Sequence, residues 1–177
     1  MTRSPQPVPI GPGALMQCVG PSLFLQELTM IIARFLHVLS AVIWVGGMFF
    51  AYMALRPVAA KMLEPAQRLT LWAGVFGRFF PWVWTAVALI LGSGLYMMAQ
   101  LGKPAVYVMI MAALGILMML LFAHLYFALF GKLKRAVLAQ EWPAGAAVLG
   151  KMRMVIAVNL SLGLLTVTAA TLGKLLG

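Results

Sequence analysis

The stretch that decides the fold is FLHVLSAVIWVGGMFF, which occupies residues 35–50 and contains a single ionisable side chain, His37. The run is continuous and shows no alternation between polar and apolar positions, so it favours a helix over a strand. Together with the apolar residues on either side, it is long enough to cross about 30 Å of hydrocarbon.

Composition extends this interpretation to the whole chain. Of the 177 residues, 64% are hydrophobic and only 9% are charged, and the mean hydropathy is +1.03. A soluble domain of this size would need far more polar surface. No segment alternates with a period of two, which argues against a transmembrane barrel as well. The sequence therefore predicts an all-α integral membrane protein.

Four spans are predicted, at about 28–55, 71–99, 105–130 and 154–176, within a transmembrane domain of residues 23–177. Pro57 is expected to end the first span after Arg56, and Pro81 is expected to kink the second. Residues 1–22 are rich in Pro and Gly and predict a disordered or surface-lying arm. Met30 is a second candidate for the start of translation.

The basic residues predict the orientation, because cations gather on the cytoplasmic side of membrane proteins. Nine lie in or beside the two longer connectors, against four on the other side. The nine are Arg56, Lys61, Arg68, Arg78, Lys132, Lys134, Arg135, Lys151 and Arg153, and the four are Arg3, Arg34, Lys103 and Lys174. We therefore expect an antiparallel four-helix bundle in a bacterial inner membrane, with both termini in the periplasm.

Charge and cysteine content exclude several functions. The three acidic residues, Glu27, Glu64 and Glu141, lie outside the predicted hydrocarbon spans, which argues against a carboxylate proton relay. The net charge of +10 does not indicate nucleic-acid binding, since the cations cluster at helix ends beside anionic headgroups. A single cysteine, Cys18, rules out an intrachain disulfide and a multi-cysteine metal site.

His37 suggests a haem b site. Helical spacing predicts a common face for five residues, Arg34, His37, Ala41, Trp44 and Met48. On that face an imidazole would ligate iron, a guanidinium would meet a propionate, and the aromatic and thioether groups would lie against the macrocycle. The alternative is a structural histidine that hydrogen-bonds a neighbouring group.

Small and sulfur-bearing residues complete this prediction. Gly46 and Gly47 would allow a ring or a neighbouring helix to approach closely. Candidates for a second ligand are the methionines predicted on the same side of the membrane, Met97, Met98, Met109 and Met111. Thioethers also suit Cu(I), although most of the fourteen methionines are better explained as apolar filler.

His124 is predicted to lie apart from His37. It is eight residues from Lys132, about 12 Å from the inner boundary, whereas His37 is 19 residues from Arg56, about 28 Å away. One haem bound by both histidines is therefore not expected. His124 is either a second metal site or a hydrogen-bond partner of Asn159, whose small-residue stripe with Gly163, Thr166 and Ala170 predicts helix packing.

The stretch LHVLSAVIWVGGMFF, followed by LRP at 55–57, resembles the first helix of the copper-resistance protein D (CopD) family and of the related HemJ-type four-helix membrane protoporphyrinogen oxidases. The AHLYF around His124 resembles the third helix of the oxidase branch. The likeness covers residues 33–130, with helix four similar by topology. The oxidase branch implies haem b and a helix-three lysine, whereas residues 109–115 read MIMAALG, which argues against porphyrinogen oxidation. The copper branch implies copper transfer across the membrane.

Three functions remain at this stage. The leading hypothesis is a haem-b electron-transfer protein that exchanges electrons with quinol or a periplasmic partner. The alternative is a Cu(I) transport or copper-tolerance protein, in which His37 and the outer methionines receive copper and a relay leads toward His124. The third is a non-catalytic membrane subunit. Small-residue stripes are also compatible with a homodimer in the bilayer.

Overall fold

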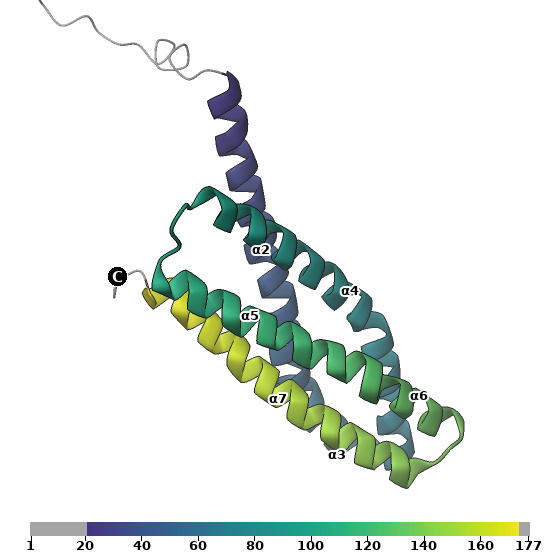
Figure 1. The fold of residues 1–177 in the computed structure, drawn as a ribbon. Coiled ribbons are helices and arrows are strands. Elements are labelled where there is room, and N and C mark those ends of the chain that lie inside the picture. The colour runs from purple at the N-terminus through teal and green to yellow at the C-terminus, as the bar shows by residue number, and fades with distance from the viewer. Residues whose placement is uncertain (1–20, 174–177) are drawn as a thin grey trace, which may run out of the picture.

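The computed structural model describes residues 21–173, which are helical throughout apart from short connectors and contain no strand. Four helical stretches are long and apolar enough to cross a membrane: Ser22–Met62, Pro65–Gln100, Val106–Leu138 and Trp142–Leu172. The all-α prediction with four spans is confirmed in these terms (Figure 1). The predicted arm lies outside the described residues, except for its last two, which open the first helix.

The first span does not end at Pro57, contrary to the prediction. It runs through α2 (Pro21–Phe50), a π-helical segment η1 (Ala51–Leu55) and α3 (Arg56–Met62). Proline has no N–H to donate to the preceding turn, and a wider turn is one way for a helix to accommodate that. The Arg56 N–H bonds to the Ala51 carbonyl five residues back, which places the proline in the first turn of α3. The backbone becomes extended only at Leu63.

The second span is α4 (Pro65–Gln100). It begins before the predicted residue 71 because Glu64 and Gln67 form a reciprocal capping box, in which the Glu64 N–H donates to Gln67 Oε1 at 3.2 Å. Pro81 lies inside the helix, which continues on both sides of it.

The third span comprises α5 (Val106–His124), a second π-helical segment η2 (Leu125–Phe130) and α6 (Gly131–Leu138), and the fourth is α7 (Trp142–Leu172). The helices therefore extend beyond the predicted span boundaries near 130 and 154. The basic segment between these boundaries stays largely helical, because Lys, Arg and Ala are good helix formers. The chain turns instead at residues 139–141, where Gln140 has a φ of 55°.

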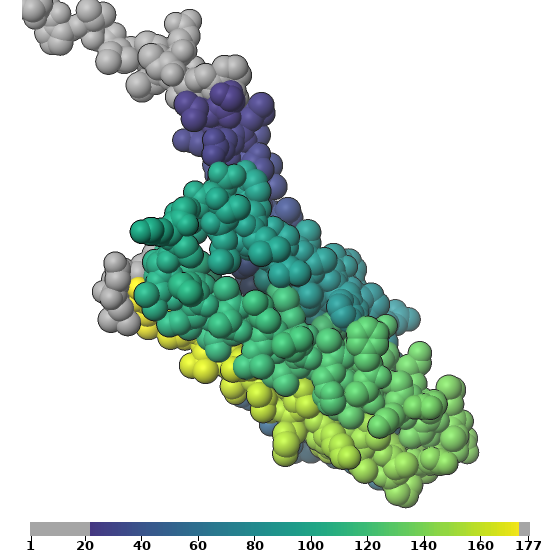
Figure 2. All heavy atoms as spheres, in the orientation of Figure 1, coloured from purple at the N-terminus to yellow at the C-terminus, as the bar shows by residue number. Residues whose placement is uncertain are grey.

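The helices pack mainly as two pairs, α2 with α4 and α5 with α7. Gln26 near the start of α2 donates a hydrogen bond to Gln100 at the end of α4, at 3.1 Å. Further along the pair, Gly47 lies against the distal edge of the Phe79 ring. Figure 1 shows α5 and α7 side by side, and Figure 2 shows an opening between α4 and α5 near their connecting loop.

Aromatic rings form the centre of the core. The Phe80 ring lies 5.1 Å from Phe76, 5.5 Å from Phe122 and 4.8 Å from Phe130, between ring centroids. The Trp44 ring meets Phe122 edge to face at 6.0 Å. These contacts join α2, α4 and the third span, and edge-to-face pairs add to the packing energy of such rings. The cluster also forms one wall of the cavity described next.

Candidate functional site

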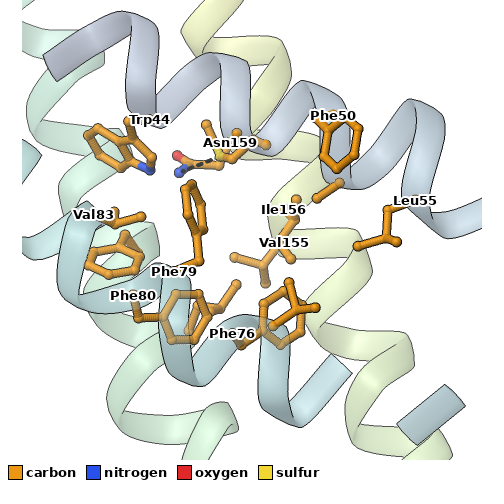
Figure 3. A pocket seen from close by; sticks show the side chains of 16 residues that line it. Trp44, Phe50, Leu55, Phe76, Phe79, Phe80, Val83, Val155, Ile156 and Asn159 are labelled. Carbon is orange, nitrogen blue, oxygen red and sulfur yellow. Dashed lines mark hydrogen bonds between the residues drawn. The ribbon is translucent and has the colours of Figure 1, made fainter. Parts of the chain in front are cut away.

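A cavity of about 230 Å³ lies inside the bundle, between α2, α4, η2 and α7. Its lining is apolar except for the amide of Asn159 and the indole N–H of Trp44. The lining residues are Trp44, Gly47, Met48, Phe50, Ala51, Leu55, Val75, Phe76, Phe79, Phe80, Val83, Phe122, Leu125, Val155, Ile156 and Asn159. Figure 3 shows Asn159 near Trp44, with the ring of Phe79 facing it from α4.

Asn159 is the polar centre of this cavity. Its side chain is only 4% exposed, and Nδ2 donates a weak hydrogen bond to the Met48 sulfur at 3.6 Å. Its carbonyl oxygen, Oδ1, is buried and has no hydrogen-bond partner among the described residues. Buried polar atoms are nearly always partnered, because an unmet one costs about 1–3 kcal/mol. Asn159 therefore holds an unused acceptor at a buried position beside a thioether.

A second buried thioether, that of Met118 on α5, contacts the α7 face that carries Asn159. Thr166, nearly two turns from Asn159 on α7, places its hydroxyl 3.9 Å from the Met118 sulfur. Between them, a Cβ added at Gly163 would lie 3.2 Å from Met118 Cε and 2.9 Å from Val45 Cγ2. Gly163 thus lets α2 and α5 close onto α7. The predicted role of this small-residue stripe in helix packing is confirmed at Gly163.

His37 occupies a separate position between α2 and α4. Its Nδ1 lies 2.9 Å from the Ser93 hydroxyl oxygen, and that hydroxyl also contacts the Leu89 carbonyl. A carbonyl oxygen only accepts, so the single hydroxyl proton points to Leu89. The His37 Nδ1–H then donates to Ser93, which leaves Nε2 as the ring nitrogen that carries the lone pair. Metal-binding histidines commonly use this pattern, with the second nitrogen donating to a protein oxygen.

The comparison with known families bears on the same helices. A model of the copper resistance protein D family matches residues 73–172, from early α4 to the end of α7.

This chain belongs to the copper resistance protein D family.

We found no match among curated proteins and none among solved structures. The matched range overlaps the predicted resemblance over residues 73–130, begins after the first helix, and includes α7, for which the sequence predicted similarity only in topology. It favours the copper alternative over the haem hypothesis, which receives no support from the comparisons or from the geometry, since His37 does not line the cavity. The resemblance to the oxidase branch remains an expectation from sequence.

The structure separates the residues that were predicted to share one haem face. Trp44, Met48 and Gly47 line the cavity, and Trp44 and Met48 are buried. Arg34, the predicted propionate partner, is exposed, whereas its neighbour Ala33 is buried. The buried stripe of α2 thus runs one residue earlier than we predicted at this end.

The methionines predicted as second ligands differ in how exposed they are. Met97, Met98 and Met111 are half-buried, whereas Met109 is exposed. Met97 follows Ser93 by one helical turn, which places it on the same side of α4 as the partner of His37. Gly47 supports a close contact with Phe79, as predicted, but a Cβ on Gly46 would meet no atom within 4 Å.

The predicted hydrogen bond between His124 and Asn159 is wrong. His124 is exposed on the bundle surface, while the Asn159 amide points inward to Met48. A matching depth does not fix the rotation of a helix about its axis, and that rotation decides which residues meet. Across residues 21–173, no three His, Cys, Asp or Glu side chains come together as a metal site.

Neither the contact of Ser93 with His37 nor the pairing of Asn159 with Met48 was predicted from the sequence. Ser93 lies in the triplet GSG at 92–94, where a hydroxyl between two glycines interrupts an apolar helix. A Cβ on Gly94 would lie 3.3 Å from His37 Cε1, so the second glycine makes room for the imidazole. That interruption was a usable signal, whereas nothing in the sequence pairs residues 48 and 159.

Proposed function

We propose that the chain handles Cu(I) as cargo in a copper-tolerance role, and passes it along ligands inside the bundle. The observation that carries the proposal is the Met48 thioether beside the unpartnered Asn159 carbonyl, in a cavity lined mainly by apolar side chains. Thioether sulfur is a soft ligand that suits Cu(I). Membership of the copper resistance protein D family supports the same cargo.

His37 is the proposed point of entry. With Nδ1 donating to Ser93, its Nε2 lone pair is available to a metal. Met97, one turn further along α4, is the proposed thioether partner. From His37 to Met48 is 11 residues, or about 16 Å along α2, so transfer between them requires an intermediate ligand or a movement of the ion.

The proposal also includes an arrangement in the membrane. The contacts of Gln26 with Gln100 and of Gly47 with Phe79 support an antiparallel α2–α4 pair. The nine cations in or near the long connectors support a cytoplasmic position for those connectors. His37 then faces the periplasmic side of a bacterial inner membrane, and copper moves inward past Met48.

The test is Cu(I) transfer into proteoliposomes that contain a trapped Cu(I) chelator. Met48→Leu and Met118→Leu conserve volume and should cost less than about 1.5 kcal/mol of stability. We expect each to reduce the transfer rate at least tenfold, and His37→Gln to do the same. The matched control is Met154→Leu, which removes a thioether that is 73% exposed and should leave the rate unchanged.

The same purified protein distinguishes the alternatives. A Soret band that disappears in His37→Gln would favour the haem hypothesis and contradict ours. A colourless protein that neither binds nor transfers Cu(I) would favour a non-catalytic subunit. Equal rates for Met48→Leu, Met118→Leu and the wild type would remove the thioethers from the proposed path.

A further inference from the structure

Three arginines from three helices converge at one end of the bundle. Arg56 of α3 and Arg153 of α7 flank a small apolar cleft of about 10 Å³, together with Tyr52 and Trp72. Arg68 of α4 is close enough for its charge, like that of Arg56, to act on Arg153. The guanidinium carbon of Arg56 lies 4.8 Å from the centroid of the Tyr52 ring. Each of the three arginines is half-buried.

This cluster has no built-in counter-charge in the described contacts. The chain has three acidic residues. Glu64, the nearest to Arg68 in sequence, uses its side chain to cap α4. Glu27 follows Gln26, which bonds to the far end of α4, and Glu141 is exposed in the turn before α7. Like charges that are partly withdrawn from water repel one another, and a bound anion would relieve that repulsion.

The surroundings indicate what kind of anion fits. The cleft lies where apolar spans end, and apolar side chains beside it face outward: Met53 is 55% exposed, Val58 52% and Met154 73%. Guanidinium groups bind phosphate through paired hydrogen bonds. Basic pockets between membrane helices commonly receive lipid headgroups, while outward apolar side chains contact acyl chains.

We propose that Arg56, Arg68 and Arg153 form a binding site for the phosphate group of an anionic phospholipid. The headgroup lies at the surface between the three guanidinium groups, outside the small apolar cleft, and the acyl chains lie along α3 and α7. None of the three arginines lines the central cavity, although the cleft and the cavity share Ala51, Phe76 and Ile156.

The test is native mass spectrometry of the full-length protein in detergent, titrated with phosphatidylglycerol or with zwitterionic phosphatidylcholine. We expect the wild type to bind phosphatidylglycerol preferentially. Arg56→Gln, Arg68→Gln and Arg153→Gln should each weaken that binding about fivefold or more, the effect of one cation near a membrane surface. Arg153→Lys should retain part of the affinity, because lysine keeps the positive charge but cannot form the paired hydrogen bonds of a guanidinium group.

The matched control is Lys151→Gln, which removes an exposed cation two residues from Arg153 on the same helix. Equal losses for Lys151→Gln and Arg153→Gln would overturn the proposal in favour of a diffuse basic surface. Equal binding of the two lipids by the wild type would overturn it as well, and that comparison needs no variant to fold.

A further arm distinguishes a lipid headgroup from free phosphate. Inorganic phosphate is added at millimolar concentration to the delipidated protein and to the lipid complex. Retention of phosphatidylglycerol, with no phosphate adduct on the delipidated protein, supports the lipid site. Displacement of the lipid together with a stable phosphate adduct would overturn it and assign the cluster to a soluble anion.

Discussion

Replacing Asn159 with leucine should make the protein more stable, although a buried polar contact is lost. The substitution removes the unpartnered Oδ1 atom, whose burial costs about 1–3 kcal/mol. It also removes the weak bond to the Met48 sulfur, and polar contacts inside membrane proteins average about 0.6 kcal/mol. The difference is a gain of roughly 0.5–2 kcal/mol in the free energy of unfolding. Leucine branches at the same carbon as asparagine, and the adjoining cavity of about 230 Å³ accepts its extra methyl volume.

The assay is reversible unfolding in mixed micelles, followed by circular dichroism. Thr166→Val is the matched control on the same helix, because the Thr166 hydroxyl already contacts the Leu162 carbonyl at 2.8 Å. It should gain no stability. If Asn159→Leu has an unchanged or lower free energy of unfolding, then the amide oxygen is satisfied in the folded protein and our reasoning fails. If the gain is observed and Cu(I) transfer falls, asparagine is present at position 159 for function rather than stability.

Three further predictions concern packing, each measured by the same unfolding assay. Gly47→Ala should lower the free energy of unfolding by about 1–3 kcal/mol, because its new methyl collides with a phenylalanine ring of α4. Gly46→Ala meets no atom within 4 Å and should raise it by roughly 0.5–1 kcal/mol through helix propensity. Equal effects of the two substitutions would contradict the close contact between Gly47 and α4. Phe122→Ala should cost about 3–5 kcal/mol, since that ring contacts two tryptophans and two other aromatic rings. Phe127→Ala, at a side chain 73% exposed, should change stability by less than about 0.5 kcal/mol, and a comparable loss would place Phe127 in an interface. Ser93→Ala should lower the free energy of unfolding by about 0.5–1.5 kcal/mol. It should also broaden the imidazole resonances of its histidine partner in NMR spectra, because the tautomer is no longer fixed. A sharp, unshifted spectrum would show that the hydroxyl does not fix the tautomer of the ring.

The sequence by itself determined that the helices suit a lipid bilayer rather than water, the class of secondary structure and the number of spans. These properties depend on local composition, since a long apolar run must satisfy its backbone hydrogen bonds internally once it lies in hydrocarbon. The resemblance near His37 also pointed to the copper resistance protein D family, which the match over residues 73–172 then established. The span ends were placed less well, because polarity marks the membrane boundary rather than the end of a helix.

Tertiary structure decided which residues meet. Both Arg34 and Ala33 fit a helical face near His37, and only the packing of α2 on α4 shows that Ala33 is buried and Arg34 exposed. Likewise, depth alone paired Asn159 with His124, whereas the rotation of α7 aims the amide at Met48. In lipid, apolar faces have no water to avoid, so hydropathy does not fix that rotation. Close approach at small residues such as Gly163 fixes it instead, through contacts between segments distant in the chain.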